Sequence, residues 1–242
     1  MSAAMSGDKA LAVILARSGS KGLPGKNEAV VAGRPMLAWT VDHGSAAASI
    51  GKIVLTTDGD RLATIGRTLG VDVIERPSNL ATDTATVDAA ARHAVASLGD
   101  PYEVVVLLYG NVPVRPEGLI DRGVSMLLET GCDSVQSVCA VGKTHPWWMK
   151  TVDDAGRMTA YVENQVYRRQ DLPPVYQLDG GLIVVRREAL FTVQEGEPHA
   201  FLGADRRAVV TEPGEVVDID TAADLAVAEA ALLNRRAAGR VA

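Results

Sequence analysis

Short apolar segments of β type alternate with longer stretches of helical periodicity along this 242-residue chain. The β-type segments cover residues 11–16, 52–56, 71–74, 104–108, 134–138 and 182–185. Helical stretches cover residues 35–48, 61–69, 85–98 and 117–129, and a closing helix is expected over residues 221–238. This alternation predicts an α/β fold over residues 1–242 as one domain, with a mainly parallel sheet and helices on both faces.

A basic, glycine-rich loop follows the first β-type segment directly. Its members are three glycines and three cations, namely Arg17, Gly19, Lys21, Gly22, Gly25 and Lys26. No acidic residue occurs between residues 10 and 27. Glycines let a backbone approach phosphate oxygens closely, and the cations supply the opposite charge, so the loop predicts a phosphate-binding site. A surface turn with solvated cations is the alternative.

Two common phosphate motifs do not match this loop. Five residues separate Gly19 from Gly25, where the P-loop has four, and Asn27 stands where that motif needs a serine or threonine. The glycines recur at every third position, which differs from the dinucleotide-binding pattern. The loop therefore predicts phosphate binding of another type.

A second signal is an acidic doublet near the end of the chain, in which Asp218 and Asp220 flank an isoleucine. In an extended segment alternate side chains share a face, so both carboxylates can converge on one hard cation, for which Mg²⁺ is the natural candidate. The alternative is a helix cap at Asp220 beside a solvated Asp218. Asp58 and Asp60 form a competing pair, which a turn and a helix cap at Asp60 would explain.

Composition excludes several classes of protein. A formal net charge of −6 argues against nonspecific binding to nucleic acids or anionic membranes, which require a cationic surface. No apolar run is long enough to span a bilayer. The two cysteines, Cys132 and Cys139, lack the spacing of a zinc site and are interpreted as small buried side chains. A cytoplasmic location is expected.

Residues 143–178 interrupt the alternation and hold half of the aromatic side chains of a chain that is only 4% aromatic. Their aromatic members are Trp147, Trp148, Tyr161, Tyr167 and Tyr176. Because such a segment favours contact with a protein surface over water, we interpret it as a small dimerisation arm and expect a homodimer. A lid, or a small core private to the segment, is the alternative.

Several motifs, in order and spacing, resemble those of the acylneuraminate cytidylyltransferases. The glycine loop reads Ala12-Val-Ile-Leu-Ala-Arg-x-x-Ser-Lys-Gly-Leu-Pro-x-Lys-Asn27. Further matching motifs are Thr57-Asp-Gly59, Gly70-Val71, Arg76-Pro77, Leu80-Ala-Thr-Asp-Thr84, Arg169-Gln-Asp-Leu-Pro173 and Asp218-Ile-Asp-Thr221. The resemblance covers nearly the whole chain. It implies a nucleotidyltransferase fold of Rossmann-like type, and an enzyme that joins an acidic 2-keto sugar to CMP from CTP with magnesium, releasing pyrophosphate.

The resemblance also implies roles for individual residues. On the nucleotide side these are Arg17, Ser20, Lys21, Gly22, Lys26, Asn27 and Arg76, with Asn27 reading cytosine. Arg17 and Lys21 would act on the triphosphate in catalysis, and Asp218 and Asp220 would bind the magnesium. A structural ion pair is equally open for Arg76.

Two departures from the family pattern bear on the sugar. After the fourth β-type segment the family usually reads Leu-Leu-Gln-Pro-Thr-Ser-Pro-Leu-Arg, whereas this chain has Leu107-Leu-Tyr-Gly-Asn-Val-Pro-Val-Arg115. Tyr109 thus replaces a glutamine that faces the sugar, and Gln177 stands where an arginine often occurs. With Arg169 these residues are expected to bind the substrate. A changed hydrogen-bond pattern and volume favour a nonulosonic or related 2-keto-3-deoxy acid other than N-acetylneuraminate.

Two rival functions are open at this stage. One is a nucleotidyltransferase acting on a sugar 1-phosphate, and the other is a nucleotide-binding homologue without turnover. The Asn27 loop and the acidic doublet resemble the sugar-acid branch better than the first rival. The intact Arg17, Lys21, Asp218 and Asp220 argue against the second.

Overall fold

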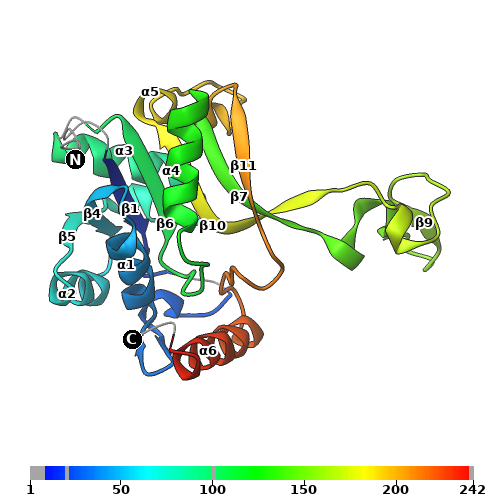
Figure 1. Ribbon diagram of the computed structural model, residues 1–242, viewed down its shortest axis with the longest axis horizontal. Helices are drawn as coiled ribbons and strands as arrows, with labels where there is room; N and C mark the ends of the chain where they lie inside the picture. The colour runs from blue at the N-terminus through cyan, green and yellow to red at the C-terminus, as the bar shows by residue number, and fades with distance from the viewer. Residues whose placement is uncertain (1–8, 20–21, 100–101, 240–242) are drawn as a thin grey trace.

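The computed structural model describes residues 9–19, 22–99 and 102–239. Its centre is a seven-stranded sheet with the strand order β11-β7-β10-β6-β1-β4-β5 (Figure 1). The strands are β1 (Ala10–Leu15), β4 (Ile50–Thr57), β5 (Asp72–Glu75), β6 (Val104–Tyr109), β7 (Ser134–Ala140), β10 (Tyr176–Arg186) and β11 (Arg206–Thr211). Only β10 runs antiparallel to its neighbours, so the predicted mainly parallel sheet is confirmed.

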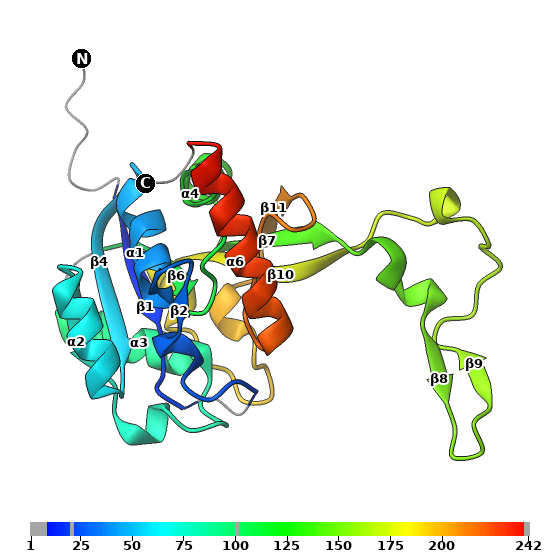
Figure 2. The same ribbon diagram turned by 90° about the horizontal axis from the view of Figure 1, so that it is seen from below.

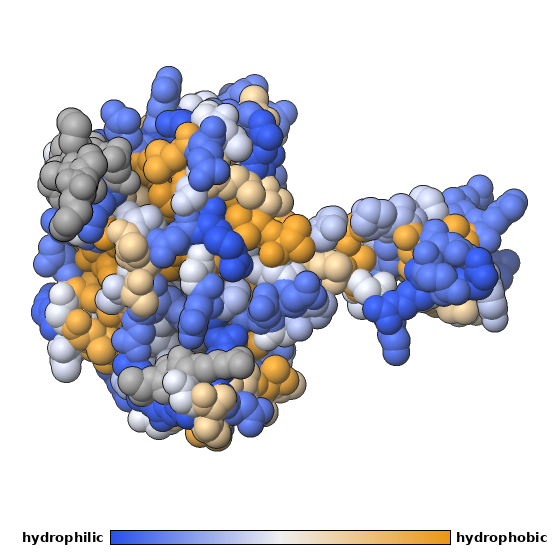
Figure 3. Space-filling model, viewed as in Figure 1, coloured by the Kyte–Doolittle hydropathy of each residue, from blue (hydrophilic) through white to orange (hydrophobic). Residues whose placement is uncertain are grey.

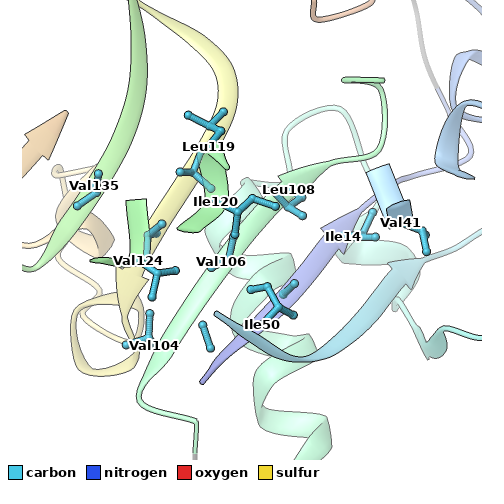
Figure 4. Packing of buried hydrophobic residues seen from close by; sticks show 14 of the residues in the cluster. Ile14, Val41, Ile50, Val104, Val106, Leu108, Leu119, Ile120, Val124 and Val135 are labelled. Carbon is cyan, nitrogen blue, oxygen red and sulfur yellow. The ribbon is translucent and has the colours of Figure 1, made fainter. Parts of the chain in front are cut away.

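Helices cover both faces of the sheet because successive strand residues point to opposite sides. The helices α1 (Met36–Ala46), α2 (Asp60–Thr68) and α4 (Leu119–Thr130) pack on the face that holds Ile14 and Val106. Figure 4 shows this packing, with Leu119 and Val124 of α4 and Val41 of α1 against the strands. The helices α3 (Val87–Leu98) and α5 (Arg187–Leu190) pack on the opposite face. The predicted helical layers are confirmed.

A third apolar cluster joins the closing helix to the glycine-loop half of the chain. Helix α6 (Ala222–Ala237) packs beside a hairpin of β2 (Val30–Val31) and β3 (Arg34–Pro35). The buried Trp39 of α1 lies in this cluster, with the guanidinium groups of Arg34 and Arg236 over its ring at 4.6 and 5.0 Å. Thr221 and Asp224 form the capping box expected from the sequence.

The chain also contains short 3₁₀ helices. They are η1 (Lys26–Glu28), η2 (Ser78–Leu80), η3 (Gly142–Thr144), η4 (Pro146–Trp148), η5 (Arg169–Asp171) and η6 (Ala200–Leu202). Three features differ from the sequence-based expectation. Strand β11 was not expected, because this edge strand begins with two arginines and leaves most of its residues exposed. Strand β10 is longer than predicted, and Cys139 is only half-buried, whereas Cys132 is buried.

The segment between β7 and β10 projects from the body as an arm (Figures 1 and 2). It carries a hairpin of β8 (Lys150–Val152) and β9 (Met158–Ala160). A small centre of its own forms around the buried His145, whose ring meets Trp147 edge-on at 5.7 Å. Tyr167, in contrast, is 92% exposed. The arm therefore has both an internal core and a free aromatic surface.

None of the helices in the described part of the chain is long and apolar enough to cross a membrane.

A pair of neighbouring leucines on α4 tests the sheet packing. Leu127 is fully buried in the sheet–helix cluster, whereas Leu128 is 46% exposed. We expect Leu127→Ala to lower the free energy of unfolding by about 2–5 kcal/mol, because it leaves a cavity in a close-packed layer. Leu128→Ala is the matched control and should change it by about 0.5 kcal/mol or less. Urea denaturation checks both values, and equal effects would contradict the packing described.

Candidate active site

The glycine loop lies at the carboxyl end of β1, where ligands bind in open parallel sheets. Its first residues are attached to the end of β4, because the backbone N–H and the hydroxyl of Ser18 both donate to the Asp58 carboxylate at 2.8 Å. Asp58 is thus a support for the loop. The cap expected at Asp60 is wrong: Gly59 is the N-cap of α2, and no side chain caps that helix.

Two residues predicted to bind the triphosphate, Ser20 and Lys21, lie outside the described residues.

A pocket opens beside the loop, between the carboxyl ends of β1 and β6 and the start of α3. Its polar walls come from Arg17, Lys26, Asn27, Arg76, Thr82, Thr86, Tyr109 and Asn111. Its apolar walls come from Leu15, Leu80, Ala85, Val87 and Ala90. Four predicted nucleotide-binding residues therefore line one pocket, together with the predicted sugar-binding residue Tyr109.

The two arginines of the pocket are held in different ways. Arg17 forms an ion pair with Asp83 at 2.9 Å and donates to the Ala81 carbonyl. Arg76 is buried, and its guanidinium donates to the Thr56 carbonyl at 2.8 Å. Burial lowers the pKa of Arg76, and the positive charge of Arg17 lowers it further while Asp58 opposes the shift. The pocket thus concentrates positive charge, as a polyphosphate site requires.

Asn27 is buried in the pocket wall at 5% exposure. Its side-chain N–H donates to the Arg17 carbonyl at 2.8 Å, which attaches η1 to the end of the loop. Its carbonyl oxygen is buried and has no hydrogen-bond partner in the described part of the chain. An unpaired buried acceptor is costly, so this atom is suited to receive a donor from a ligand.

The acidic doublet meets the glycine loop, although 194 positions separate the two residues in contact. Lys26 Nζ lies 2.7 Å from an Asp220 carboxylate oxygen. A Cβ atom on Gly22 would lie 2.8 Å from the Asp220 carbonyl oxygen, so only glycine allows the two backbones to approach this closely. The two strongest sequence signals therefore belong to one site.

The doublet has the alternation expected of an extended segment. Val217 and Ile219 are buried, while Asp218 is half-buried and Asp220 is exposed on the other side. An antiparallel bridge between Val217 and Val114 fixes the direction of the segment.

The electrostatics of the doublet suit a divalent cation. Burial raises the pKa of Asp218 to about 6, and the negative charge of Asp220 adds to the shift, while Lys26 and Arg115 oppose it. Two carboxylates this close repel each other unless a cation lies between or beside them. No group of three or more metal-binding side chains occurs within residues 9–19, 22–99 and 102–239. Two carboxylates with substrate phosphates form a common magnesium site, so the residues present fit that ion.

Asn111 is a site residue that the sequence reasoning did not single out. Its side-chain N–H donates both to the Asp218 carboxylate and to the Ile219 carbonyl, and the residue also lines the pocket. Beside it, burial raises the pKa of Tyr109, and the charge of Asp218 contributes. Asn111 lies in the same altered motif, residues 109–115, from which the sequence analysis selects only Tyr109. That departure from the family pattern is the signal that could have identified Asn111.

Arg169 and Gln177, both expected at the sugar, lie away from this pocket in a single chain. Arg169 belongs to η5 on the arm, and Gln177 lies at the root of the arm, where its amide contacts the Cys139 sulfur at 3.6 Å. Neither residue lines the pocket. The physical reason is the direction of the arm, which leads away from the body (Figure 2).

Comparisons with known proteins show which proteins this chain is similar to. The family model described as Cytidylyltransferase matches residues 11–212. An N-acylneuraminate cytidylyltransferase of Streptococcus agalactiae serotype III is 33% identical over 183 residues, which are 74% of this chain and 44% of the relative. This chain thus spans about half the length of the first curated relatives that it matches.

Other relatives match over nearly their full length. A CMP-N,N'-diacetyllegionaminic acid synthase of Legionella pneumophila is 29% identical over 231 residues, covering 90% of this chain and 94% of the relative. A structure of CMP:2-keto-3-deoxy-manno-octonic acid synthetase complexed with CTP aligns with a TM-score of 0.72 at 17% identity, covering 94% of this chain and 99% of the other. That structure supports the fold.

The position of Arg17 makes the nucleotide side testable. We expect Arg17→Ala to weaken CTP binding about tenfold to a hundredfold, because charge-assisted hydrogen bonds to phosphate are lost. Arg67→Ala, on an exposed position of α2, is the matched control and should leave affinity unchanged. Isothermal titration with CTP measures both. Unchanged affinity of the Arg17 variant would remove this side chain from the phosphate site.

Proposed function

Since this chain belongs to the cytidylyltransferase family, in its acylneuraminate cytidylyltransferase group, we propose that it transfers CMP from CTP to an acidic sugar. The acceptor is the anomeric hydroxyl of a 2-keto-3-deoxy acid of the nonulosonic class, and pyrophosphate is released. The single observation that carries this proposal is the contact between the glycine loop and the acidic doublet through Lys26 and Asp220. That contact brings together the cations that would bind a triphosphate and the carboxylates that would bind a metal.

The residues that line the pocket support a position for each part of CTP. The triphosphate would lie against Arg17, Lys26 and the glycine amides, in exchange for their present acidic partners. The free carbonyl oxygen of Asn27 would accept a hydrogen bond from the amino group of cytosine. The α-phosphate would then lie toward Asn111 and Asp218, where the sugar hydroxyl attacks as the bond to pyrophosphate breaks.

Asp218 and Asp220 would hold the magnesium ion that the proposed reaction requires. When bound, this ion would neutralise negative charge on the triphosphate and on the sugar acid. The side chains of the protein otherwise act by positioning and by charge, because in-line transfer at phosphorus gains most from alignment and electrostatic stabilisation. Asn111 contributes by holding Asp218 in place.

The side of the pocket at Tyr109 supports a sugar other than N-acetylneuraminate. A phenol offers one hydroxyl and a large apolar ring where the family glutamine offers an amide, so the pocket accepts a different pattern of substituents. The relative that matches over nearly its full length is named for a diacetylated legionaminic acid. Sugar acids of this kind are therefore the first candidates. A cytoplasmic location, where CTP is made, is part of the proposal.

One assay tests the proposed activity against its rivals. The chain is incubated with CTP, magnesium chloride and one acceptor at a time: N-acetylneuraminate, N,N'-diacetyllegionaminate, 3-deoxy-manno-octulosonate or glucose 1-phosphate. We expect pyrophosphate release and a CMP-sugar by mass spectrometry with one acid. Release with glucose 1-phosphate alone would favour the sugar-phosphate rival, and CTP binding without any release would favour the homologue without turnover.

Asp220→Asn should reduce the turnover found in this assay about a hundredfold or more, because a metal-binding charge is lost at the reacting phosphates. Asp72→Asn is the control, since Asp72 is the first residue of the edge strand β5, at the end of the sheet away from the pocket. Its turnover should equal that of the natural chain. A large fall in melting temperature for the Asp220 variant, with turnover retained, would make this residue a structural one.

The exposed apolar side chains of the arm support a homodimer as part of the proposal. They include Val152 at 64%, Met158 at 67%, Tyr161 at 63% and Tyr167 at 92%. Figure 3 shows apolar surface along the arm and where it leaves the body. In a dimer the arm would lie against a second copy, and Arg169 would reach a substrate only in the site of that copy.

Light scattering after gel filtration tests the dimer. At micromolar concentration we expect a mass twice that of one chain. Replacing both Tyr161 and Tyr167 with glutamate should shift the mass toward one chain, because charges in an apolar contact are costly. Val193→Glu is the control, at a residue 72% exposed outside the arm, and should leave the mass unchanged. A monomeric natural chain would contradict the proposal.

A further inference from the structure

Arg115 is a buried arginine whose charge meets no carboxylate within hydrogen-bond distance in the described part of the chain. It is 1% exposed, and it lies in the segment that connects β6 to α4. Burial lowers the pKa of its guanidinium to about 9, against the opposing effects of Asp218 and Asp179. Burying a charge without a paired carboxylate is expensive, so the hydrogen bonds that this group makes must be geometrically specific.

Those hydrogen bonds converge on three segments that shape one end of the pocket. Nε donates to the Gly181 carbonyl at 2.7 Å, and Nη2 donates to the Tyr109 carbonyl at 3.0 Å. Nη1 donates to the Val112 carbonyl and lies 3.2 Å from the Thr40 hydroxyl. The guanidinium therefore spans the β6 turn, strand β10 and helix α1.

The two carbonyls held in the turn lie on either side of Asn111. Asn111 in turn contacts the Asp218 carboxylate, and its own carbonyl accepts from the Ile219 N–H at 3.0 Å. Gly181 follows Gly180, where a Cβ atom would lie 3.1 Å from an Asp218 carboxylate oxygen. Arg115 thus touches both backbones that border Asp218, without touching Asp218 itself by a hydrogen bond.

Thr40 of α1 contacts the same turn as Arg115. Its side chain is fully buried on α1, and its hydroxyl lies 3.3 Å from the Tyr109 carbonyl and 3.2 Å from the Val112 carbonyl. On the other side, Arg235 of α6 donates to the Arg115 carbonyl at 2.7 Å. The turn is therefore held from α1, β10 and α6, with Arg115 at the centre.

We propose that Arg115, with Thr40, is a positioning residue for the reacting end of the site. It fixes the turn at residues 109–112 so that Asn111 orients Asp218 and Tyr109 lines the sugar side of the pocket. The nucleotide side does not depend on it, because Arg17 and Asn27 are held by contacts outside both the turn and the acidic segment. This inference rests on the proposed function for the identity of the reaction, and it adds a residue whose loss should separate turnover from CTP binding.

Arg115→Lys is the most informative variant, because lysine keeps the charge but cannot span three carbonyls with a planar fork. We expect kcat to fall tenfold or more with the sugar acid identified by the pyrophosphate assay, while the Kd for CTP stays within threefold. Arg122→Lys, at an exposed position on α4, is the matched control and should change neither value. A folded Arg115→Lys variant with kcat within twofold of the natural chain would overturn the proposal. An equal loss of CTP affinity and kcat would do the same, because it would indicate a general loss of structure.

Two further measurements keep the proposal falsifiable. If Arg115→Lys does not fold, Thr40→Val removes only the buried hydroxyl, and the same loss of kcat at constant Kd for CTP is expected from it. Hydrogen–deuterium exchange requires no turnover and so separates this inference from the proposed function. In whichever of the two variants is used, amides of peptides over residues 109–112 and 217–220 should exchange at least fivefold faster than in the natural chain. The exchange rate over residues 26–31 should stay unchanged. Equal exchange in all three regions would overturn the positioning role even if no sugar acid were turned over.

Discussion

The close approach between the glycine loop and the acidic segment is the constraint on which the whole site depends. The ion pair of Lys26 with Asp220 marks this contact, but Asp220 is 71% exposed, and such a pair contributes only about 0–1 kcal/mol. Apolar packing places the segments instead, because Val217 and Ile219 are buried in the cluster that α6 forms with Trp39. Gly22 then permits backbone contact that any larger residue would prevent. The fold thus brings the charges together, and the charges do not build the fold.

The site is prepared for anions by cations that already have acidic neighbours. Arg17 pairs with Asp83 and Lys26 pairs with Asp220, while Arg76 is fixed against a backbone carbonyl. Under the proposed function, a bound triphosphate would replace these carboxylates as the partner of Arg17 and Lys26, which the present ion pairs already hold at the pocket. Such preorganisation is what makes fixed charges effective in transfer reactions, because the protein need not reorganise as charge develops.

Under the proposed function, the sugar side of the site would be built differently, from a turn and, in a dimer, from the arm of a second copy. The turn carries Tyr109 and Asn111 and is held from beneath by the buried guanidinium of Arg115. The arm carries Arg169 and leads away from the pocket of its own chain (Figure 2). Under the proposed function, nucleotide contacts would lie close to the first strand, whereas substrate contacts would come from segments further along the chain. Under the proposed function, this division lets specificity for the sugar change without altering the phosphate site.

Local regularities in the sequence determined the strand and helix pattern, the glycine loop at the end of β1, and the capping box of Thr221 with Asp224. Each depends on residues a few positions apart, where periodicity and turn chemistry act directly. Three features were decided by the tertiary structure alone. Asp58 accepts hydrogen bonds from Ser18, Asn111 donates to Asp218 although 107 positions separate them, and Arg169 lies on the arm away from the pocket. Strand β11 escaped prediction for a related reason, since an exposed edge strand lacks the apolar pattern of a buried one. Contacts of this kind depend on which strand ends lie side by side, and that order is set by packing of the whole sheet, which no short stretch of sequence encodes.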